Sequence, residues 1–246
     1  MPQPVHYIPV VTTVFALIFS ILVFMRYQEK GRGTHLLWWS AGIFIYGIGT
    51  FTEGFVTLFG WGESIFRVWY ISGALLGGMP LAQGTVYLLL KKRTANILTA
   101  FVVPYFIIAS VYIMMAPIDA SLVEPHRLSG GVIAEDWQWV RAFSPFINLY
   151  ALVFLAGGAM YSAYRFKKSP KTYHRYIGNV FIAVGALLPG IGGSFTRYGY
   201  VEVLYVTELL GLTCIYIGYI YNIQNKVMAR DEIALEERVA EEQPVV

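Results

Sequence analysis

Seven long apolar stretches dominate this sequence and restrict what it can fold into. A helix that crosses a bilayer needs about 20 mostly apolar residues, because it rises about 1.5 Å per residue through about 30 Å of hydrocarbon. Each stretch meets that length, and the connecting segments are short apart from residues 117–140. The sequence therefore predicts an all-α, seven-transmembrane helix bundle, with spans near residues 7–25, 36–60, 66–90, 95–116, 141–164, 176–196 and 201–223.

The composition agrees with a membrane protein. Only 13% of the residues are Asp, Glu, Lys or Arg, and the mean hydropathy is +0.56. A soluble domain has about 25% of these charged residues, because its whole surface faces water. The net charge of +3 is small, so nucleic-acid binding is not expected. We expect a multi-pass protein of the inner (cytoplasmic) membrane of a bacterium or archaeon, with the lipid bilayer as its surroundings.

The positions of the basic residues predict the orientation. Lysine and arginine concentrate in cytoplasmic links, and only Arg67, Arg127, Arg141 and Arg197 lie on the other side. We therefore expect the N-terminus outside and the C-terminus in the cytoplasm. The remaining basic residues, which fix this assignment, are Arg26, Lys30, Arg32, Lys91, Lys92, Arg93, Arg165, Lys167, Lys168, Lys171, Arg175, Lys226, Arg230 and Arg238.

The chain divides into a membrane domain, residues 1–224, and an acidic cytoplasmic helical tail, residues 225–246. The tail is rich in helix formers and carries six acidic residues between Asp231 and Glu242. We expect the last helix to continue into the tail and to fray near Pro244. The alternative is a tail that docks a protein partner through an apolar stripe formed by Met228, Leu235 and Val239.

Several kinds of chemistry are excluded by the residues present. All seven lysines lie at predicted cytoplasmic ends or links, so no lysine is placed for a retinal Schiff base. The four histidines lie in loops or at helix ends, without the spacing of a haem or zinc site. The single cysteine, Cys214, excludes a thiolate metal site. We therefore expect no cofactor, no metal and no enzymatic activity.

Polar side chains within the spans are the functional candidates, because burying them in lipid is unfavourable. Glu53, Asn148 and Glu208 each lie about 10–12 Å below the outer surface when counted along their helices. One interpretation is an outward-facing pocket for a small ligand, lipid or proton. The other is an interhelical clamp in which Arg67 pairs with Glu53 or Glu208. The candidate ligand-binding residues are Glu53, Arg67, Tyr70, Ser72, Asn148, Tyr205 and Glu208.

Prolines, glycines and one glutamine indicate where the helices bend or pack. Pro80 and Pro189 are the candidate hinges, because each removes a backbone donor within a span. The glycines within the spans predict close helix packing. Gln83, three residues after Pro80, is expected to bond the carbonyl freed by that proline. Residues 117–140 are either an ordinary exposed loop, which we favour, or a lid over an outer opening.

The sequence resembles the seven-helix membrane sensor module at the N-terminus of some bacterial histidine kinases and diguanylate cyclases. The resemblance places Glu53, Arg67 and Pro80 in a sensing core. Because no output domain is expected after the last span, it implies either signalling through a separate partner or a loss of signalling. We expect a receptor-like sensor module; the alternatives are a small transporter or channel, or a structural subunit of a larger complex. The positions that carry the resemblance are Trp38-Trp39, Glu53, Arg67-Val-Trp69-Tyr70, Pro80, Tyr87, Lys91-Lys92-Arg93, the Pro189 stretch from Gly185 to Gly193, and Val206-Thr-Glu208-Leu.

Overall fold

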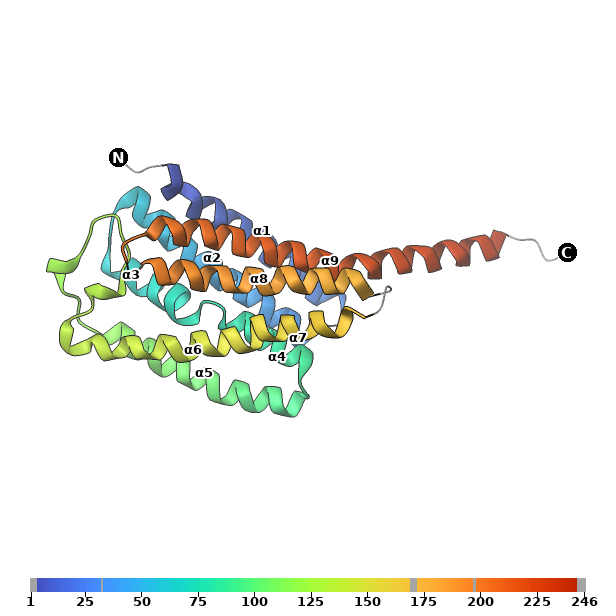
Figure 1. Ribbon diagram of the computed structural model, residues 1–246, viewed down its shortest axis with the longest axis horizontal. Coiled ribbons are helices and arrows are strands. Elements are labelled where there is room, and N and C mark those ends of the chain that lie inside the picture. Colours follow the sequence, from blue (N-terminus) through green and yellow to red (C-terminus); the bar gives the residue numbers. More distant parts are fainter. Residues whose placement is uncertain (1–3, 32, 169–171, 197, 243–246) are drawn as a thin grey trace.

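Seven helical units of the computed structural model are long and apolar enough to cross a membrane, which confirms the predicted spans. The structure describes residues 4–31, 33–168, 172–196 and 198–242. Within them the chain is helical apart from short links and one longer connection (Figure 1). By length and composition it is therefore a multi-pass membrane protein. The seven helical units long enough to cross a membrane are Pro4–Glu29, Thr34–Phe59, Glu63–Leu89, Lys92–Met115, Glu135–Phe166, Tyr173–Thr196 and Val201–Ile223.

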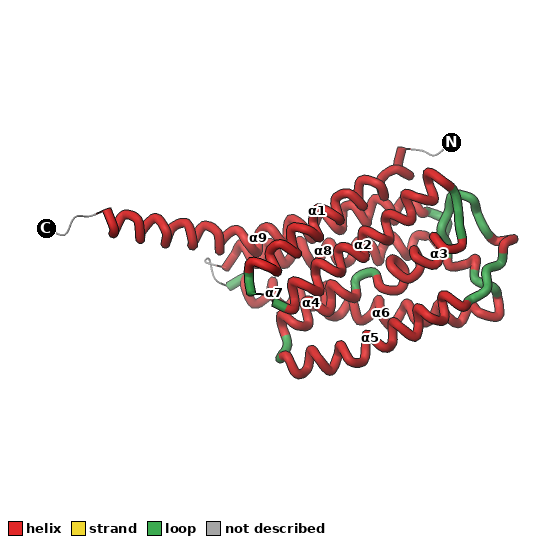
Figure 2. Tube along the Cα trace, turned by 180° about the vertical axis from the view of Figure 1, so that it is seen from behind, coloured by secondary structure: helices red, strands yellow, loops and turns green. Residues whose placement is uncertain are grey.

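Four of the spans are single α-helices, and a fifth is lengthened by a short 3₁₀ turn. Helix α1 (Ile8–Glu29), which follows a 3₁₀ turn at Pro4–Tyr7, packs along α2 (Thr34–Phe59). Helix α8 (Tyr173–Thr196) packs along α9 (Val201–Glu242), and α5 (Lys92–Met115) lies at the side of the bundle. Figure 2 shows α9 leaving the bundle and continuing well beyond it as one helix. The predicted continuation of the last span into the tail is thus present, whereas residues 243–246, including Pro244, lie outside the described residues.

The third span is not one regular helix. It consists of α3 (Glu63–Trp69), a π-helical segment η2 (Tyr70–Leu76) and α4 (Met79–Leu89). Gly77 separates the last two with a φ of +35°, a conformation that favours glycine. Pro80 lies in the first turn of α4, where its missing N–H leaves no helical hydrogen bond unmade. The span is therefore already broken beside the candidate hinge Pro80.

The fifth span is interrupted in a similar way and touches the third at the interruption. It runs through the 3₁₀ segment η5 (Glu135–Ala142), α6 (Phe143–Ala151), the π-helical segment η6 (Leu152–Ala156) and α7 (Gly157–Phe166). A Cβ placed on Gly78 would lie 3.2 Å from the Ala151 side chain, so the two spans meet closely there. Since π-helical segments are frequent at functional sites, this contact marks the region around it for attention.

Helices α8 and α9 are held together by glycines, as the sequence predicts. Gly178 and Gly185 of α8 are seven residues apart and face Gly218 and Gly211 of α9. A Cβ on Gly185 would lie 2.5 Å from the Gly211 carbonyl oxygen, and one on Gly178 would lie 2.8 Å from that of Gly218. Such spacing lets two backbones touch. The candidate hinge Pro189 also packs here, with its Cδ 3.0 Å from a Cβ placed on Gly211.

This packing makes one glycine much more sensitive to substitution than its neighbour. We expect Gly185→Ala to lower the melting temperature by several degrees, because its methyl group must push α9 away, at a cost of about 1–3 kcal/mol. Gly190→Ala is the matched control, since a Cβ there meets nothing within 4 Å. Thermal unfolding of the two variants in detergent measures the difference. Equal melting temperatures would contradict the close contact between α8 and α9.

The two ends of the bundle differ in charge. We call the end with the 3₁₀ turn Pro4–Tyr7 and residues 117–134 the loop end, and the end where α9 leaves the bundle the tail end (Figure 1). Residues Arg32, Lys171 and Arg197 lie outside the described residues. The orientation across the membrane stays a prediction, and it rests on the basic residues that the structure places at the tail end: Arg26, Lys30, Lys91, Lys92, Arg93, Arg165, Lys167, Lys168 and Arg175.

Residues 117–134 are folded over the loop end rather than freely exposed. The Ala134 N–H donates to the Pro117 carbonyl at 2.9 Å, so the ends of this segment lie side by side. Its apolar side chains Val132 and Ile133 are buried. The Pro125 carbonyl accepts a hydrogen bond from the Trp61 N–H at 2.8 Å. The segment is therefore packed onto the bundle in part, while other residues, such as the 54% exposed Leu122, are exposed as the favoured expectation has it.

Candidate functional site

Glu53 lies in the interior where the second, third and seventh spans meet. Only 3% of its surface is exposed, although it carries a carboxyl group. Its Oε1 accepts a hydrogen bond from the Trp69 Nε1 at 3.0 Å. Trp69 is the last residue of α3, directly before the π-helical segment. This bond therefore ties α2 to the third span at the point where that span stops being a regular α-helix.

Glu208 of α9 faces Glu53. The two carboxyl groups lie within hydrogen-bonding range of each other. If both glutamates are ionised, neither Oε2 atom has a hydrogen-bond partner among the described residues. Both Oε2 atoms are closed to solvent. Two like charges at this separation and away from water repel strongly. The contact becomes favourable when one proton lies between the two groups, as in other pairs of buried carboxyls.

Two tyrosines complete the surroundings of the carboxyl pair. The Tyr46 hydroxyl, two turns from Glu53 on α2, donates to the Glu208 backbone carbonyl at 3.0 Å. Tyr205, on α9, is 3% exposed and lies close enough to interact electrostatically with both carboxyl groups. Tyr46 thus fixes α9 against α2 through the backbone, and the acid side chains are left facing each other.

Charged residues at the loop end cover this junction. Arg127 donates to Glu124 at 2.9 Å and to the Thr196 carbonyl at 3.2 Å, which ties residues 117–134 to the end of α8. His6 lies 3.6 Å from Glu202 of α9 and packs edge-on against the Tyr205 ring. The carboxyl pair is thereby separated from the loop-end water by Tyr205 and this ring of polar side chains.

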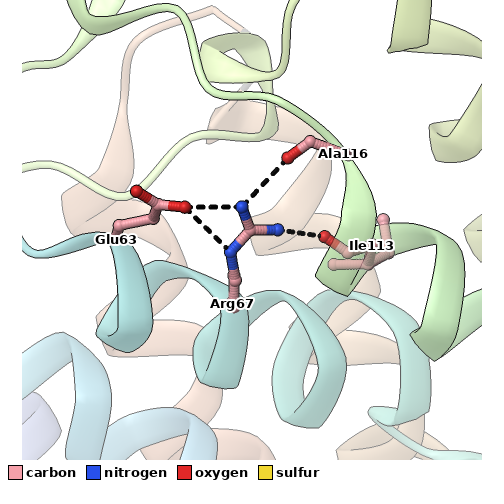
Figure 3. A network of polar contacts seen from close by, with 4 residues as sticks. All are labelled: Glu63, Arg67, Ile113 and Ala116. Carbon is pink, nitrogen blue, oxygen red and sulfur yellow. Dashed lines mark hydrogen bonds and ion pairs between the residues drawn. The ribbon is translucent and has the colours of Figure 1, made fainter.

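Arg67 does not join the carboxyl pair. Figure 3 shows its guanidinium between Glu63 and the C-terminal end of α5. It donates to Glu63 Oε1 at 2.6 Å and to the carbonyls of Ile113 and Ala116 at 2.5 and 3.0 Å. Among the described residues it bonds neither glutamate of the pair, so the predicted Arg67 clamp is wrong. Arg67 and Trp69 are two residues apart, about 200° around the helix, and point to opposite sides.

This position gives Arg67 a structural role that can be measured. We expect Arg67→Met to lower stability by about 2–3 kcal/mol, because the last carbonyls of α5 lose a charged donor. Glu63→Gln is the control, since removing the exposed partner of an ion pair costs about 0–1 kcal/mol. Melting temperatures in detergent would compare the two. A loss in Arg67→Met no larger than in Glu63→Gln would contradict this role.

The other candidate residues lie around the pair without joining it. Ser72 packs against α2 near Gly49, but its hydroxyl donates to its own helix at the Val68 carbonyl, at 2.7 Å. Tyr70 is buried and contacts Phe66. Asn148 is exposed on α6, and its Oδ1 lies 3.8 Å from a Cβ placed on Gly77. Of the predicted set, the structure brings together Glu53, Tyr205 and Glu208.

A second polar cluster lies nearer the tail end. Gln83 is fully buried; its side chain donates to Thr99 at 2.7 Å and to the Ala95 carbonyl at 3.3 Å, and it accepts from the Tyr150 hydroxyl. The expectation that Gln83 bonds the carbonyl freed by Pro80 is therefore wrong, because its amide group points away from its own helix and joins α4 to α5 and α6. Both ends of the amide are satisfied, as in a structural cross-link.

The sequence comparisons leave the site to be interpreted from its geometry. No protein-family model and no curated protein matches this sequence. Among the described residues, no group of three or more His, Cys, Asp or Glu side chains could hold a metal ion. The two facing carboxyl groups can bind a positive charge between them and release it again. Either event changes the electrostatic force between α2 and α9.

Proposed function

We propose that this chain is a non-catalytic, receptor-like membrane sensor module, in which the Glu53–Glu208 pair is the sensing site and α9 is the output element. One observation carries the proposal. Glu208 lies in the second turn of a 42-residue helix, Val201–Glu242, and that helix projects from the tail end of the bundle (Figures 1 and 2). A displacement of α9 at the site therefore moves the far end of the same helix.

The electrostatic energy of the two carboxyl groups is large enough to shift a conformational equilibrium. Two unit charges about 4 Å apart repel by about 4 kcal/mol at an effective dielectric constant near 20. A ligand must favour one arrangement by about 5.5 kcal/mol to move a population from 1:99 to 99:1. Neutralising one carboxyl group of the pair supplies most of such a difference, because it removes the repulsion between α2 and α9.

The packing supports movement of α8 and α9 as one unit. The contacts of Gly185 with Gly211 and of Gly178 with Gly218 bring the two backbones together along their length. The contact between α9 and α2 includes the carboxyl pair and the bond from Tyr46. A change of charge at the pair therefore acts on the contact between α9 and α2, while α8 follows α9. A hinge at Pro189 within this unit stays a prediction.

The interior also favours a sensor over a transporter or channel. Leu75 and Met79 are 0% and 1% exposed and lie between Trp69 and Gln83 along the third span. They separate the carboxyl pair from the second polar cluster with apolar side chains. A docking role for residues 225–246 fits the same proposal, because the output of the module requires a partner that reads the position of the tail.

The proposal can be tested by measuring the position of the tail. Spin labels on Lys91→Cys and Ala229→Cys, in a Cys214→Ala background in nanodiscs, report the distance from the tail to the bundle. We expect Glu208→Lys to change the distance distribution, because it replaces repulsion with attraction to Glu53. Glu208→Gln gives a milder version of the same change at alkaline pH.

A matched control separates this effect from a general effect of charge. Glu135 is exposed at the start of the fifth span, so Glu135→Lys alters the charge of the chain without touching the pair. Its distance distribution should equal that of the unsubstituted protein. Identical distributions in the unsubstituted protein, Glu208→Lys and Glu208→Gln would overturn the proposal.

A further inference from the structure

The space around the carboxyl pair restricts its ligand. Glu53 and Tyr205 are each 3% exposed and Glu208 is partly buried, and the Oε2 atoms of both glutamates are closed to solvent. The indole of Trp69 lies against Glu53 and is bonded to its Oε1. A ligand that binds here without unpacking three helices must fit between two carboxyl oxygens.

We propose that the ligand of this site is a proton, held between Glu53 and Glu208 and exchanged with water at the loop end. The inference rests on the proposed sensor function and names the ligand of its site. Binding forms an O–H bond on one carboxylate and a hydrogen bond to the other. Release breaks that O–H bond, passes the proton to water and leaves two carboxylates.

The unpartnered oxygens are the observation that points to this ligand. A buried carboxylate is normally paired with a cation or with several donors. Among the described residues, the one donor that reaches Glu53 is Trp69, at Oε1; its Oε2 has no partner, and the carboxyl group lies within hydrogen-bonding range of Glu208. A proton between the two carboxyl groups bonds to one and forms a hydrogen bond to the other, whereas any larger cation needs further oxygen ligands around it.

The surrounding groups favour a particular position for the proton. Trp69 donates to Glu53 and so stabilises the charged form of that residue. The Tyr46 hydroxyl is committed to the Glu208 backbone carbonyl and leaves the Glu208 side chain without a donor from α2. We therefore place the proton on Glu208, the residue that belongs to the output helix.

The remaining charged and titratable groups lie on the loop-end side. They are Tyr205 and Glu202 on α9, His6 on the 3₁₀ turn Pro4–Tyr7, and His126 and Arg127 on residues 117–134. Arg127 and Glu202, a cation and an anion, both lie close enough to Tyr205 to interact with it electrostatically. The buried residues Leu75 and Met79 follow Trp69 along the third span toward the tail end. The proton therefore exchanges toward the loop end.

Infrared difference spectroscopy tests this inference on the unsubstituted full-length chain in nanodiscs. The C=O stretching band of a protonated carboxyl group should disappear as the pH is raised, with loss of a single proton per chain. The band should shift in D₂O and be absent in Glu208→Gln. In Glu135→Gln, the exposed control, the titrating band should remain unchanged. A band that survives in Glu208→Gln, or no titrating band at all, would overturn the inference.

A cation titration distinguishes the proton from other positive ligands. Sodium chloride is exchanged for choline chloride at constant ionic strength and constant pH, while the spin-label distance from Lys91→Cys to Ala229→Cys is recorded. The distance should follow pH and ignore this exchange. A distance that follows sodium at constant pH would overturn the proton as ligand.

Failure of this inference and failure of the sensor proposal give different results. If the tail moves in Glu208→Lys but the carboxyl band does not titrate, the proton is wrong and the sensor function stands. If the band titrates and disappears in Glu208→Gln while the tail stays in place in every sample, the proton site is right and the sensor function is wrong.

Discussion

Glu208→Gln should abolish the pH dependence of the thermal stability of this protein while leaving its expression intact. In the unsubstituted chain, the shared proton stabilises the folded state and is lost as the pH rises. Stability therefore falls with increasing pH, because the folded state binds more protons than the unfolded state over that range. A repulsion of about 4 kcal/mol would lower the melting temperature by about 8–16 °C. In Glu208→Gln, a carboxamide faces Glu53 and no such repulsion develops.

The measurement is the melting temperature in detergent at a series of pH values, followed by intrinsic tryptophan fluorescence. Glu135→Gln is the matched control, and it should retain the slope of the unsubstituted protein because Glu135 is exposed at the loop end. Glu53→Gln should behave like Glu208→Gln, since either substitution removes the second acid. If both variants keep the full slope, the pair does not control the pH response. If both fail to fold, the infrared band of the unsubstituted chain still tests the proton.

Sequence reasoning predicted the spans well because their signal is local. Each apolar run is long enough to cross a bilayer by itself, so seven helices follow from hydropathy without any knowledge of their neighbours. The interruptions were not predicted, because residues 63–89 form one continuous apolar run in sequence. Gly77 and Gly78 were recognised as packing residues, but the positive φ of Gly77 depends on how the third span packs against the fifth.

The site was predicted in part, and the missing part is rotational. Counting residues from a span end gives the depth of a side chain, and it placed Glu53, Asn148 and Glu208 at one level, of which the structure brings together Glu53 and Glu208. It does not give the direction in which a side chain points around its helix. For this reason Arg67 was expected to meet the acids, and Trp69, which bonds Glu53, was not among the candidate ligand-binding residues. Tyr46 was missed because its partner is a backbone carbonyl.

Trp69→Phe should move the pH midpoint of the tail displacement upward. Phenylalanine keeps an aromatic ring in the contact with Phe66 and Tyr70 but removes the donor to Glu53 Oε1. A hydrogen bond to a charged group contributes about 1.5–3 kcal/mol. The Glu53 charge that Trp69 stabilises is present before and after Glu208 releases its proton, and it is fully localised only once the hydrogen bond from Glu208 is lost. Part of this energy therefore opposes release when Trp69 is removed, and about 1.4 kcal/mol corresponds to one pH unit.

The shift of the midpoint also separates a sensing role of Trp69 from a purely structural one. A structural role would lower the melting temperature at every pH and leave the midpoint of the spin-label distance in place. Trp39→Phe is the matched control, because the Trp39 Nε1 donates to the Leu81 carbonyl at 3.1 Å, away from the carboxyl pair. It should lower stability without moving the midpoint. An equal midpoint in Trp69→Phe and in the unsubstituted protein would mean that the bond to Glu53 does not tune proton release, and that the third span takes no part in setting the response.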